Sequence, residues 1–85
     1  MATVLIVDDE RPHATALAKA FRRQGHEVLE AGDGREALES LRQTKVDLVI
    51  TDLMMPEMDG LDLLKAVQTL FPDIQVILMT AFGTV

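Results

Sequence analysis

Four short apolar runs, separated by stretches with helical spacing, are the feature that most limits the folds open to this chain. Three of the runs are continuous and rich in β-branched residues, which is typical of strands covered on both faces: residues 3–7, 46–51 and 74–79. The fourth, residues 26–31, alternates between apolar and charged side chains and predicts an edge strand. Strands of this kind alternating with helices predict an α/β fold.

Helix signals stand between these runs. Pro12 suits a first helical turn and Gly25 follows a last one, while Asp33 and Asp59 can each act as a helix N-cap. The third helix is expected to bury its apolar residues: Leu63, Leu64, Val67, Leu70 and Phe71. The element order is therefore β-α-β-α-β-α-β, with crossovers of the length that parallel strands require.

Right-handed crossovers between these strands predict a doubly wound parallel sheet with helices on both faces. The polar second strand belongs at an edge, which fits the flavodoxin-like order 2-1-3-4-5 with the fifth strand absent, that is 2-1-3-4. With 85 residues, the chain has room for one small domain, and we expect residues 1–85 to form it.

Composition excludes several classes of protein. The formal net charge of −6 argues against direct nucleic-acid binding, because such a surface is basic. The chain has no cysteine, so disulfides and cysteine–zinc sites are excluded. No apolar run approaches the ~20 residues of a membrane span, and no signal peptide opens the chain. We therefore expect a soluble, cytoplasmic domain without membrane contact.

Carboxylates follow the strands at one end of the expected sheet. Asp8 and Asp9 stand at the end of the first strand and Asp52 at the end of the third. Thr80, which carries a hydroxyl, stands at the end of the fourth. Two unit charges about 4 Å apart repel by roughly 4 kcal/mol at an effective dielectric of about 20. A divalent cation relieves such repulsion, and Mg²⁺ prefers oxygen ligands. Asp52 faces the pair from the sheet centre and is the best candidate for a nucleophile that accepts a phosphoryl group, to which Thr80 would donate a hydrogen bond.

Simpler interpretations exist for each residue alone. Asp8 and Asp9 precede a helix, where acidic residues favour capping. Asp52 alone would be a turn residue, and Thr80 a strand-end threonine. His13 lies one turn from the acidic edge, where a ligand role is conceivable, but an exposed helix position is expected. The convergence of the carboxylates favours a functional site.

Three segments carry a resemblance to a known family. They are VLIVDDE at residues 4–10, ITDLMMPEMDGL at residues 50–61 and ILMTAFG at residues 77–83. Together they resemble the response-regulator receiver domains of two-component signalling, in order and in spacing. The ending TAFGTV is similar to receivers that precede ATPase transcription activators, the NtrC-like branch, which would link the chain to transcription regulation.

The resemblance implies a role for each site residue. Asp52 would accept a phosphoryl group from the phosphohistidine of a histidine kinase or phosphotransfer protein. Asp9 and Asp52 would bind Mg²⁺ directly, Asp8 through water, and Met54 through its backbone carbonyl. Thr80 would be the switch hydroxyl that moves toward the phosphoryl group. The chemistry is confined to this phosphorylation and its reversal, so no turnover of a separate substrate is expected.

Family members continue with a helix, a fifth strand ending in a lysine, and a last helix, and we expect this chain to stop before them. The lysine would clamp the phosphoryl oxygen, and neither Lys19, Lys45 nor Lys65 lies where it could replace it. Losing such a hydrogen-bond donor typically lowers a reaction rate by a factor on the order of 10²–10³, so impaired phosphorylation is expected. The apolar fourth strand would become an exposed edge, which predicts a homodimer or a domain-swapped assembly through it.

Other functions remain open. The chain would serve only for interaction or dimerisation if the fold is kept and phosphorylation is lost. A metal-dependent phosphohydrolase with Asp52 as nucleophile ranks last, because Met54 offers no general acid or base. Flavin binding is disfavoured by the acidic edge, which lacks a Gly/Ser/Thr-rich phosphate loop.

Overall fold

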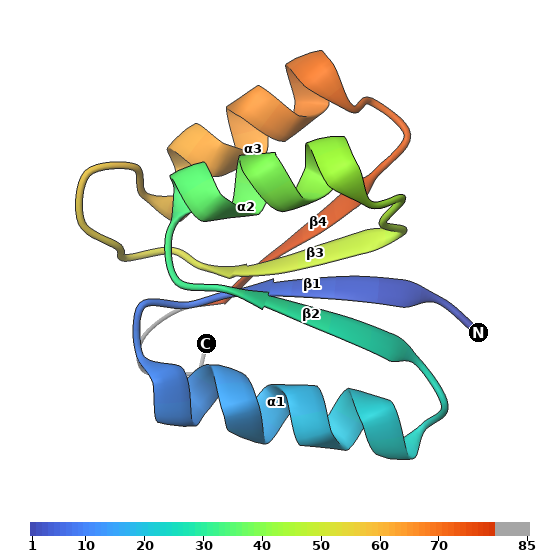
Figure 1. Cartoon of the computed structure of the whole chain (residues 1–85). Coiled ribbons are helices and arrows are strands. Elements are labelled where there is room, and N and C mark those ends of the chain that lie inside the picture. The colour runs from blue at the N-terminus through green and yellow to red at the C-terminus, as the bar shows by residue number, and fades with distance from the viewer. Residues whose placement is uncertain (80–85) are drawn as a thin grey trace.

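The computed structural model describes residues 1–79, in which strands and helices alternate (Figure 1). The elements are β1 (Thr3–Val7), α1 (Arg11–Arg23), β2 (Glu27–Ala31), α2 (Gly34–Gln43), β3 (Leu48–Asp52), α3 (Gly60–Leu70) and β4 (Gln75–Met79). Within these residues, no helix has the length and apolar character needed to cross a bilayer. The predicted order of elements is confirmed.

The strands form one parallel sheet in the order β2-β1-β3-β4, as predicted. Ile50 of β3 pairs with Ile6 of β1 on one side and with Ile77 of β4 on the other. The order reverses between β1 and β3, because the chain leaves β1 toward β2 and returns past it to β3. The ends of β1 and β3 therefore flank the switch point at which ligands bind in sheets of this type.

Helices cover both faces of the sheet. Figure 1 shows α1 on one face and α2 with α3 on the other. Alternate residues of β1 serve the two layers: Val4 and Ile6 pack against α1, whereas Leu5 and Val7 face the opposite helices. This alternation follows from the period of two along a strand, and it explains why the run reads as continuously apolar.

The expected helix signals act as predicted. The carboxylates of Asp33 and Asp59 each accept a hydrogen bond from the backbone N–H three residues on, which caps α2 and α3. Gly25, after α1, has a φ of 89°, a conformation that L side chains rarely adopt. Pro12 lies in the first turn of α1, where its missing N–H costs no hydrogen bond.

Several expectations from the sequence need correction. The second and fourth strands begin one residue later than predicted, at Glu27 and Gln75. The third strand spans Leu48–Asp52 rather than residues 46–51, because pairing with β4 extends it to Asp52, opposite Met79.

Leu64 and Phe71, expected to be buried, are only half-buried. Leu70 was expected in the core, yet it is 54% exposed. Leu63 and Val67, one turn apart, occupy the side of α3 that faces the sheet, whereas Leu70 lines an open hollow of about 530 Å³ beyond the sheet's other end.

Candidate functional site

Three carboxylates meet where β1 and β3 end. Asp52 is the last residue of β3, and Asp8 and Asp9 directly follow β1. One carboxylate oxygen of each lies within 4.8 Å of the others. Asp8 and Asp52 are buried and Asp9 is exposed, so the group opens to solvent on one side. The predicted convergence of these residues is confirmed, and we call Asp8, Asp9 and Asp52 the acid triad.

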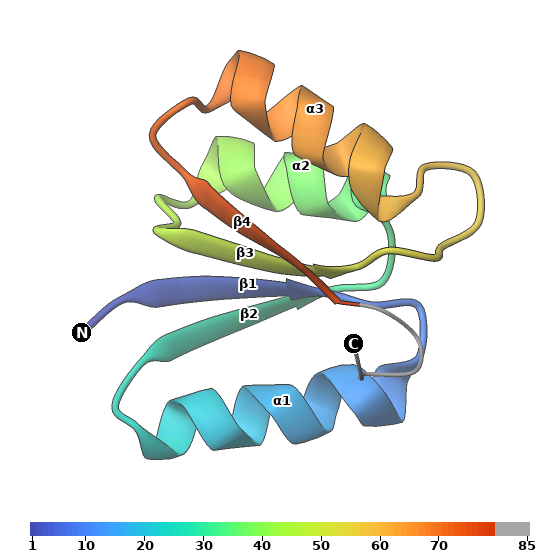
Figure 2. The same cartoon turned by 180° about the vertical axis from the view of Figure 1, so that it is seen from behind.

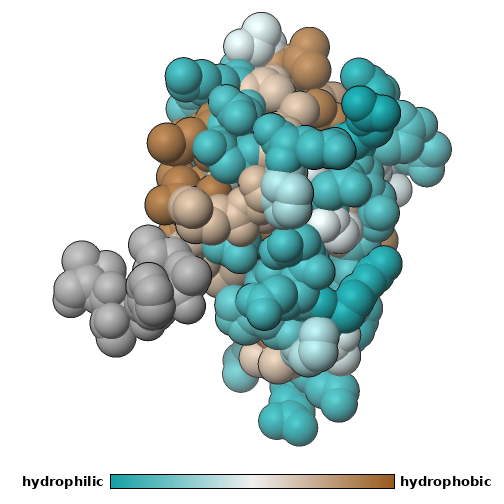
Figure 3. Space-filling view, turned by 90° about the vertical axis from the view of Figure 1, so that its left-hand side faces the viewer, coloured by the Kyte–Doolittle hydropathy of each residue, from teal (hydrophilic) through white to brown (hydrophobic). Residues whose placement is uncertain are grey.

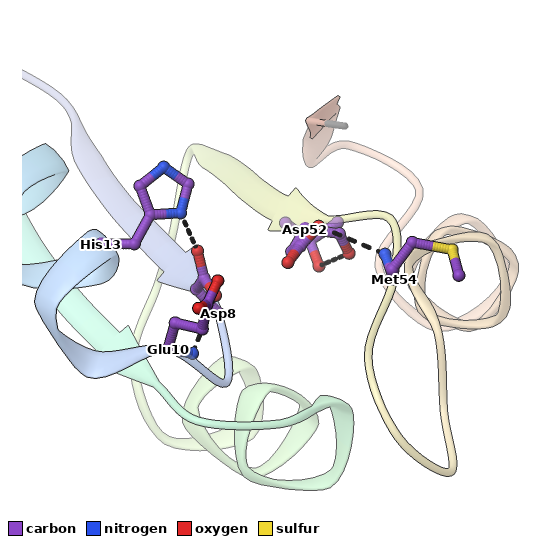
Figure 4. Close-up of polar contacts among 6 residues, drawn as sticks. Asp8, Glu10, His13, Asp52 and Met54 are labelled. Carbon is purple, nitrogen blue, oxygen red and sulfur yellow. Dashed lines mark hydrogen bonds and ion pairs between the residues drawn. The ribbon is translucent and has the colours of Figure 1, made fainter. Parts of the chain in front are cut away.

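Asp8 is fully buried, and both of its carboxylate oxygens are engaged (Figure 4). Oδ1 accepts a hydrogen bond of 2.9 Å from the backbone N–H of Glu10. Oδ2 lies 2.5 Å from Nδ1 of His13, in the first turn of α1. The side chain of His13 is 49% exposed, which agrees with the exposed helix position expected for it. Its contact with Asp8 is a feature that the sequence pattern does not predict.

Asp52 is 7% exposed, and its Oδ1 accepts a hydrogen bond of 3.2 Å from the backbone N–H of Met54 (Figure 4). The bond closes a turn just after β3 and fixes the carboxylate at the sheet edge. The side chain of Met54 is 66% exposed and points away from the acid triad in the same view. A contribution of Met54 to metal binding would therefore come from its backbone.

The helix-capping interpretation of the N-terminal acids finds little support. Glu10 occupies the N-cap position of α1, but its side chain makes no capping hydrogen bond, and the first turn contains no acidic residue. Asp8 is turned toward the Glu10 N–H and His13 instead. The two aspartates after β1 are thus better explained by the group they form with Asp52.

The start of α3 is packed tightly against Asp52, the last residue of β3, and Leu53, the residue after it. The N–H of Gly60 donates a hydrogen bond of 2.9 Å to the carbonyl of Leu53. A Cβ atom at Gly60 would lie 2.6 Å from the carbonyl oxygen of Asp52 and 2.8 Å from Cα of Leu53. Glycine is therefore required at this position, and the close approach helps to hold Asp52 in place.

The chemistry of the acid triad fits a small divalent cation. Carboxylate oxygens are the hard ligands that Mg²⁺ prefers, and three of them can approach a common point. Without a cation, their mutual repulsion at short range is unfavourable. In Figure 3, which looks onto this end of the molecule, most of the surface is hydrophilic, as a site open to hydrated ions requires. Thr80, also expected here, lies outside the described residues.

The fold and the acid triad define a class: doubly wound parallel α/β domains with a candidate cation site at the switch point of the sheet. A family model narrows this class, since the model of the response regulator receiver domain matches residues 4–85. The chain belongs to that family. Receiver domains are signalling modules of two-component systems and typically bind Mg²⁺ at an acidic pocket.

Relatives and solved structures agree with this assignment. The transcriptional regulatory protein ZraR of Escherichia coli (strain K12) is 44% identical over 82 residues, 96% of this chain and 19% of that protein. The DNA-binding transcriptional regulator NtrC of Azospirillum brasilense is 39% identical over 83 residues, 98% of this chain and 17% of that protein. The chain thus spans under a fifth of these relatives.

A solved structure that resembles this one is the response regulator protein TrrA of Thermotoga maritima, in complex with Mg²⁺ and BeF. It superimposes with a TM-score of 0.90 at 34% identity, over 95% of this chain and 70% of that chain. The likeness therefore covers nearly the whole of this chain.

Proposed function

We propose that this chain is a Mg²⁺-dependent phosphoacceptor unit, in which Asp52 takes a phosphoryl group from the phosphohistidine of a histidine kinase or phosphotransfer protein. The single observation that carries the proposal is the convergence of the acid triad, with Asp52 at the central strand and Asp8 and Asp9 opposite it. Residues 1–85 act as one unit in this proposal, in the cytoplasm, and control the output of a transcription regulator such as those among the relatives.

The transfer joins a carboxylate oxygen of Asp52 to the phosphorus atom of a reactive donor. An oxygen of Asp52 attacks the phosphorus atom, a new P–O bond forms, and the P–N bond to the donor imidazole breaks. The imidazole leaves with the bonding electrons and takes up a proton from water. Burial of Asp52 to 7% exposure, with its Oδ1 fixed by the Met54 N–H, keeps the nucleophile in one orientation for this attack.

The cation would be held by residues of this chain in distinct ways. Asp9 and Asp52 would bind it directly and Asp8 through water, with the backbone carbonyl of Met54 as a further ligand. When bound, Mg²⁺ supplies positive charge that neutralises the charge developing on the transferred group. Thr80 would donate a hydrogen bond to a phosphoryl oxygen and act as the switch.

Intact mass spectrometry tests the proposal. The protein is incubated with acetyl phosphate, a small phosphoryl donor, in the presence of Mg²⁺ and, in parallel, with the cation removed by a chelator. We expect the mass of a single phosphoryl group to be added only with Mg²⁺. Absence of the adduct under both conditions, or equal labelling in both, would contradict a metal-dependent acceptor.

A second candidate function is assembly with another copy of the chain. It is favoured by the apolar character and the edge position of β4. Figure 2 shows β4 at the edge of the sheet opposite β2. Ile77 is 49% exposed, and it lies on the face of the sheet that α1 covers, like its partner Ile50. A hydrophobic edge strand of this kind favours pairing with a second chain, as a dimer or by exchange of elements.

Light scattering checks the assembly. We expect a concentration-dependent rise in mass toward a dimer, and we expect Ile77→Lys to shift the protein toward the monomer by placing a charge on the exposed edge. Leu61→Lys is the matched control, because Leu61 is 48% exposed but lies on the helix α3 and not on the edge strand. A protein that stays monomeric at high concentration would rule out this second function.

A further inference from the structure

His13 contacts the deepest carboxylate of the acid triad without belonging to it. Its Nδ1 lies 2.5 Å from Oδ2 of Asp8, which is fully buried, while the imidazole itself is 49% exposed. In Figure 4 the ring leans from the start of α1 over the end of β1 toward Asp8. Because the imidazole is half exposed, its contact with the buried carboxylate adds little to the packing of the core. The main effect of the contact is therefore on the Asp8 carboxylate.

We propose that His13 is a positioning residue for the metal site, whose Nδ1–H donates to Asp8 and fixes the orientation of that carboxylate for cation binding. An ionised carboxylate only accepts hydrogen bonds, so Nδ1 carries the proton in this contact. The inference rests on the proposed Mg²⁺ binding by Asp8, Asp9 and Asp52. It predicts that His13 increases the affinity of this site for Mg²⁺.

The geometry explains why Asp8 needs such a partner. Without a cation, the charges of Asp9 and Asp52 repel the Asp8 carboxylate and favour its rotation away from them. The Glu10 N–H fixes only Oδ1. The bond from His13 fixes Oδ2 as well, so the plane of the carboxylate is set from both oxygens before the ion arrives.

The scaffold behind His13 is rigid enough to make this positioning effective. Ala14 and Ala18, on the buried side of α1, pack against the sheet with 1% and 0% exposure. The imidazole thus projects from a helix whose distance to β1 is fixed by small, buried side chains. Partners in the outer shell of a metal site typically contribute 10–100-fold to metal affinity.

Isothermal titration of Mg²⁺ into three proteins tests the inference. We expect His13→Leu to weaken Mg²⁺ binding about 10-fold, because it removes the donor. We expect His13→Asn to restore most of the affinity, since its amide nitrogen takes a place close to that of Nδ1 and still donates. A purely structural role would lower the metal-free stability of His13→Leu and leave its Mg²⁺ affinity unchanged, so chemical denaturation without Mg²⁺ is measured alongside.

A double-mutant cycle with Asp8→Asn provides the decisive comparison. If His13 acts through the Asp8 carboxylate, His13→Leu changes Mg²⁺ affinity in the parent protein but not in the Asp8→Asn background. Equal effects in both backgrounds would overturn the inference. Failure of His13→Asn to restore binding would also overturn it, and would indicate direct ligation by the imidazole.

The failure of the inference can be told apart from the failure of the proposed function. If the parent protein itself binds no Mg²⁺, the proposed function fails and the inference with it. Normal Mg²⁺ binding by His13→Leu overturns the inference alone.

Discussion

Replacing Asp52 by asparagine is expected to abolish the phosphoryl adduct and leave the fold intact. The amide cannot form the acyl phosphate, so transfer stops at its first step. Its oxygen can still accept the hydrogen bond from the Met54 N–H, so the turn after β3 is kept. Since the change also removes one of three mutually repelling charges, the metal-free free energy of unfolding should stay the same or rise. Intact mass after treatment with acetyl phosphate and Mg²⁺ measures the loss.

The matched control for this variant is Asp62→Asn. Asp62 lies exposed in the first turn of α3, so the same chemical change is made away from the acid triad. This control should be labelled as fully as the parent protein. A phosphoryl adduct of normal yield on Asp52→Asn would show that another residue is the acceptor, and the proposed function would have to be abandoned.

Gly60→Ala is expected to destabilise the protein by about 1–3 kcal/mol and to weaken Mg²⁺ binding. Alanine normally favours a helix over glycine by about 1 kcal/mol, so a loss of stability would be the reverse of the intrinsic preference. The physical cause is the 2.6 Å approach of the new Cβ to the carbonyl oxygen of Asp52, a backbone atom that cannot turn aside. Relief requires that α3 or the end of β3 move, and the latter displaces Asp52.

Gly34→Ala is the matched control for this prediction, because Gly34 is likewise the first residue of a helix, α2. Its Cβ would lie 2.5 Å from Sδ and 2.9 Å from Cγ of Met58, two atoms that another rotamer of this flexible side chain moves away, and 3.1 Å from the Cβ of Met58. We expect this variant to be less destabilised than Gly60→Ala and to keep its Mg²⁺ affinity. Urea denaturation of both variants makes the comparison. Equal stability losses would mean that the contact between Gly60 and Asp52 has no special role.

The fold and the acid triad were predictable because both follow from strand order. The apolar runs locate the strands, right-handed crossovers restrict the sheet, and the polar residues Glu27 and Glu30 favour an edge for β2. Once β1 and β3 are neighbours and parallel, Asp8 and Asp52 must end at the same edge. This argument does not depend on any side-chain conformation. It therefore predicts correctly which residues come together, without predicting their contacts.

The details that were missed depend on geometry beyond periodicity. His13 lies five residues from Asp8, across a turn between a strand and a helix, so neither strand nor helix spacing relates the two. Its contact depends on the angle at which α1 leaves the sheet and on the rotamers of both side chains. Leu70 fits the helical period of α3, but the period does not say where the sheet beneath the helix ends.

The most direct test of the central claim, that Asp8, Asp9 and Asp52 bind one divalent ion together, is a titration with paramagnetic Mn²⁺ followed by amide NMR. Mn²⁺ shares the preference of Mg²⁺ for oxygen ligands and broadens the resonances of nearby nuclei. We predict saturable broadening at one equivalent, confined to the amides at the ends of β1 and β3, reversed by excess Mg²⁺ and lost in Asp9→Asn. Broadening centred on the opposite end of the sheet, near Lys45 and Asp73, or spread without saturation over the acidic surface, would contradict the account.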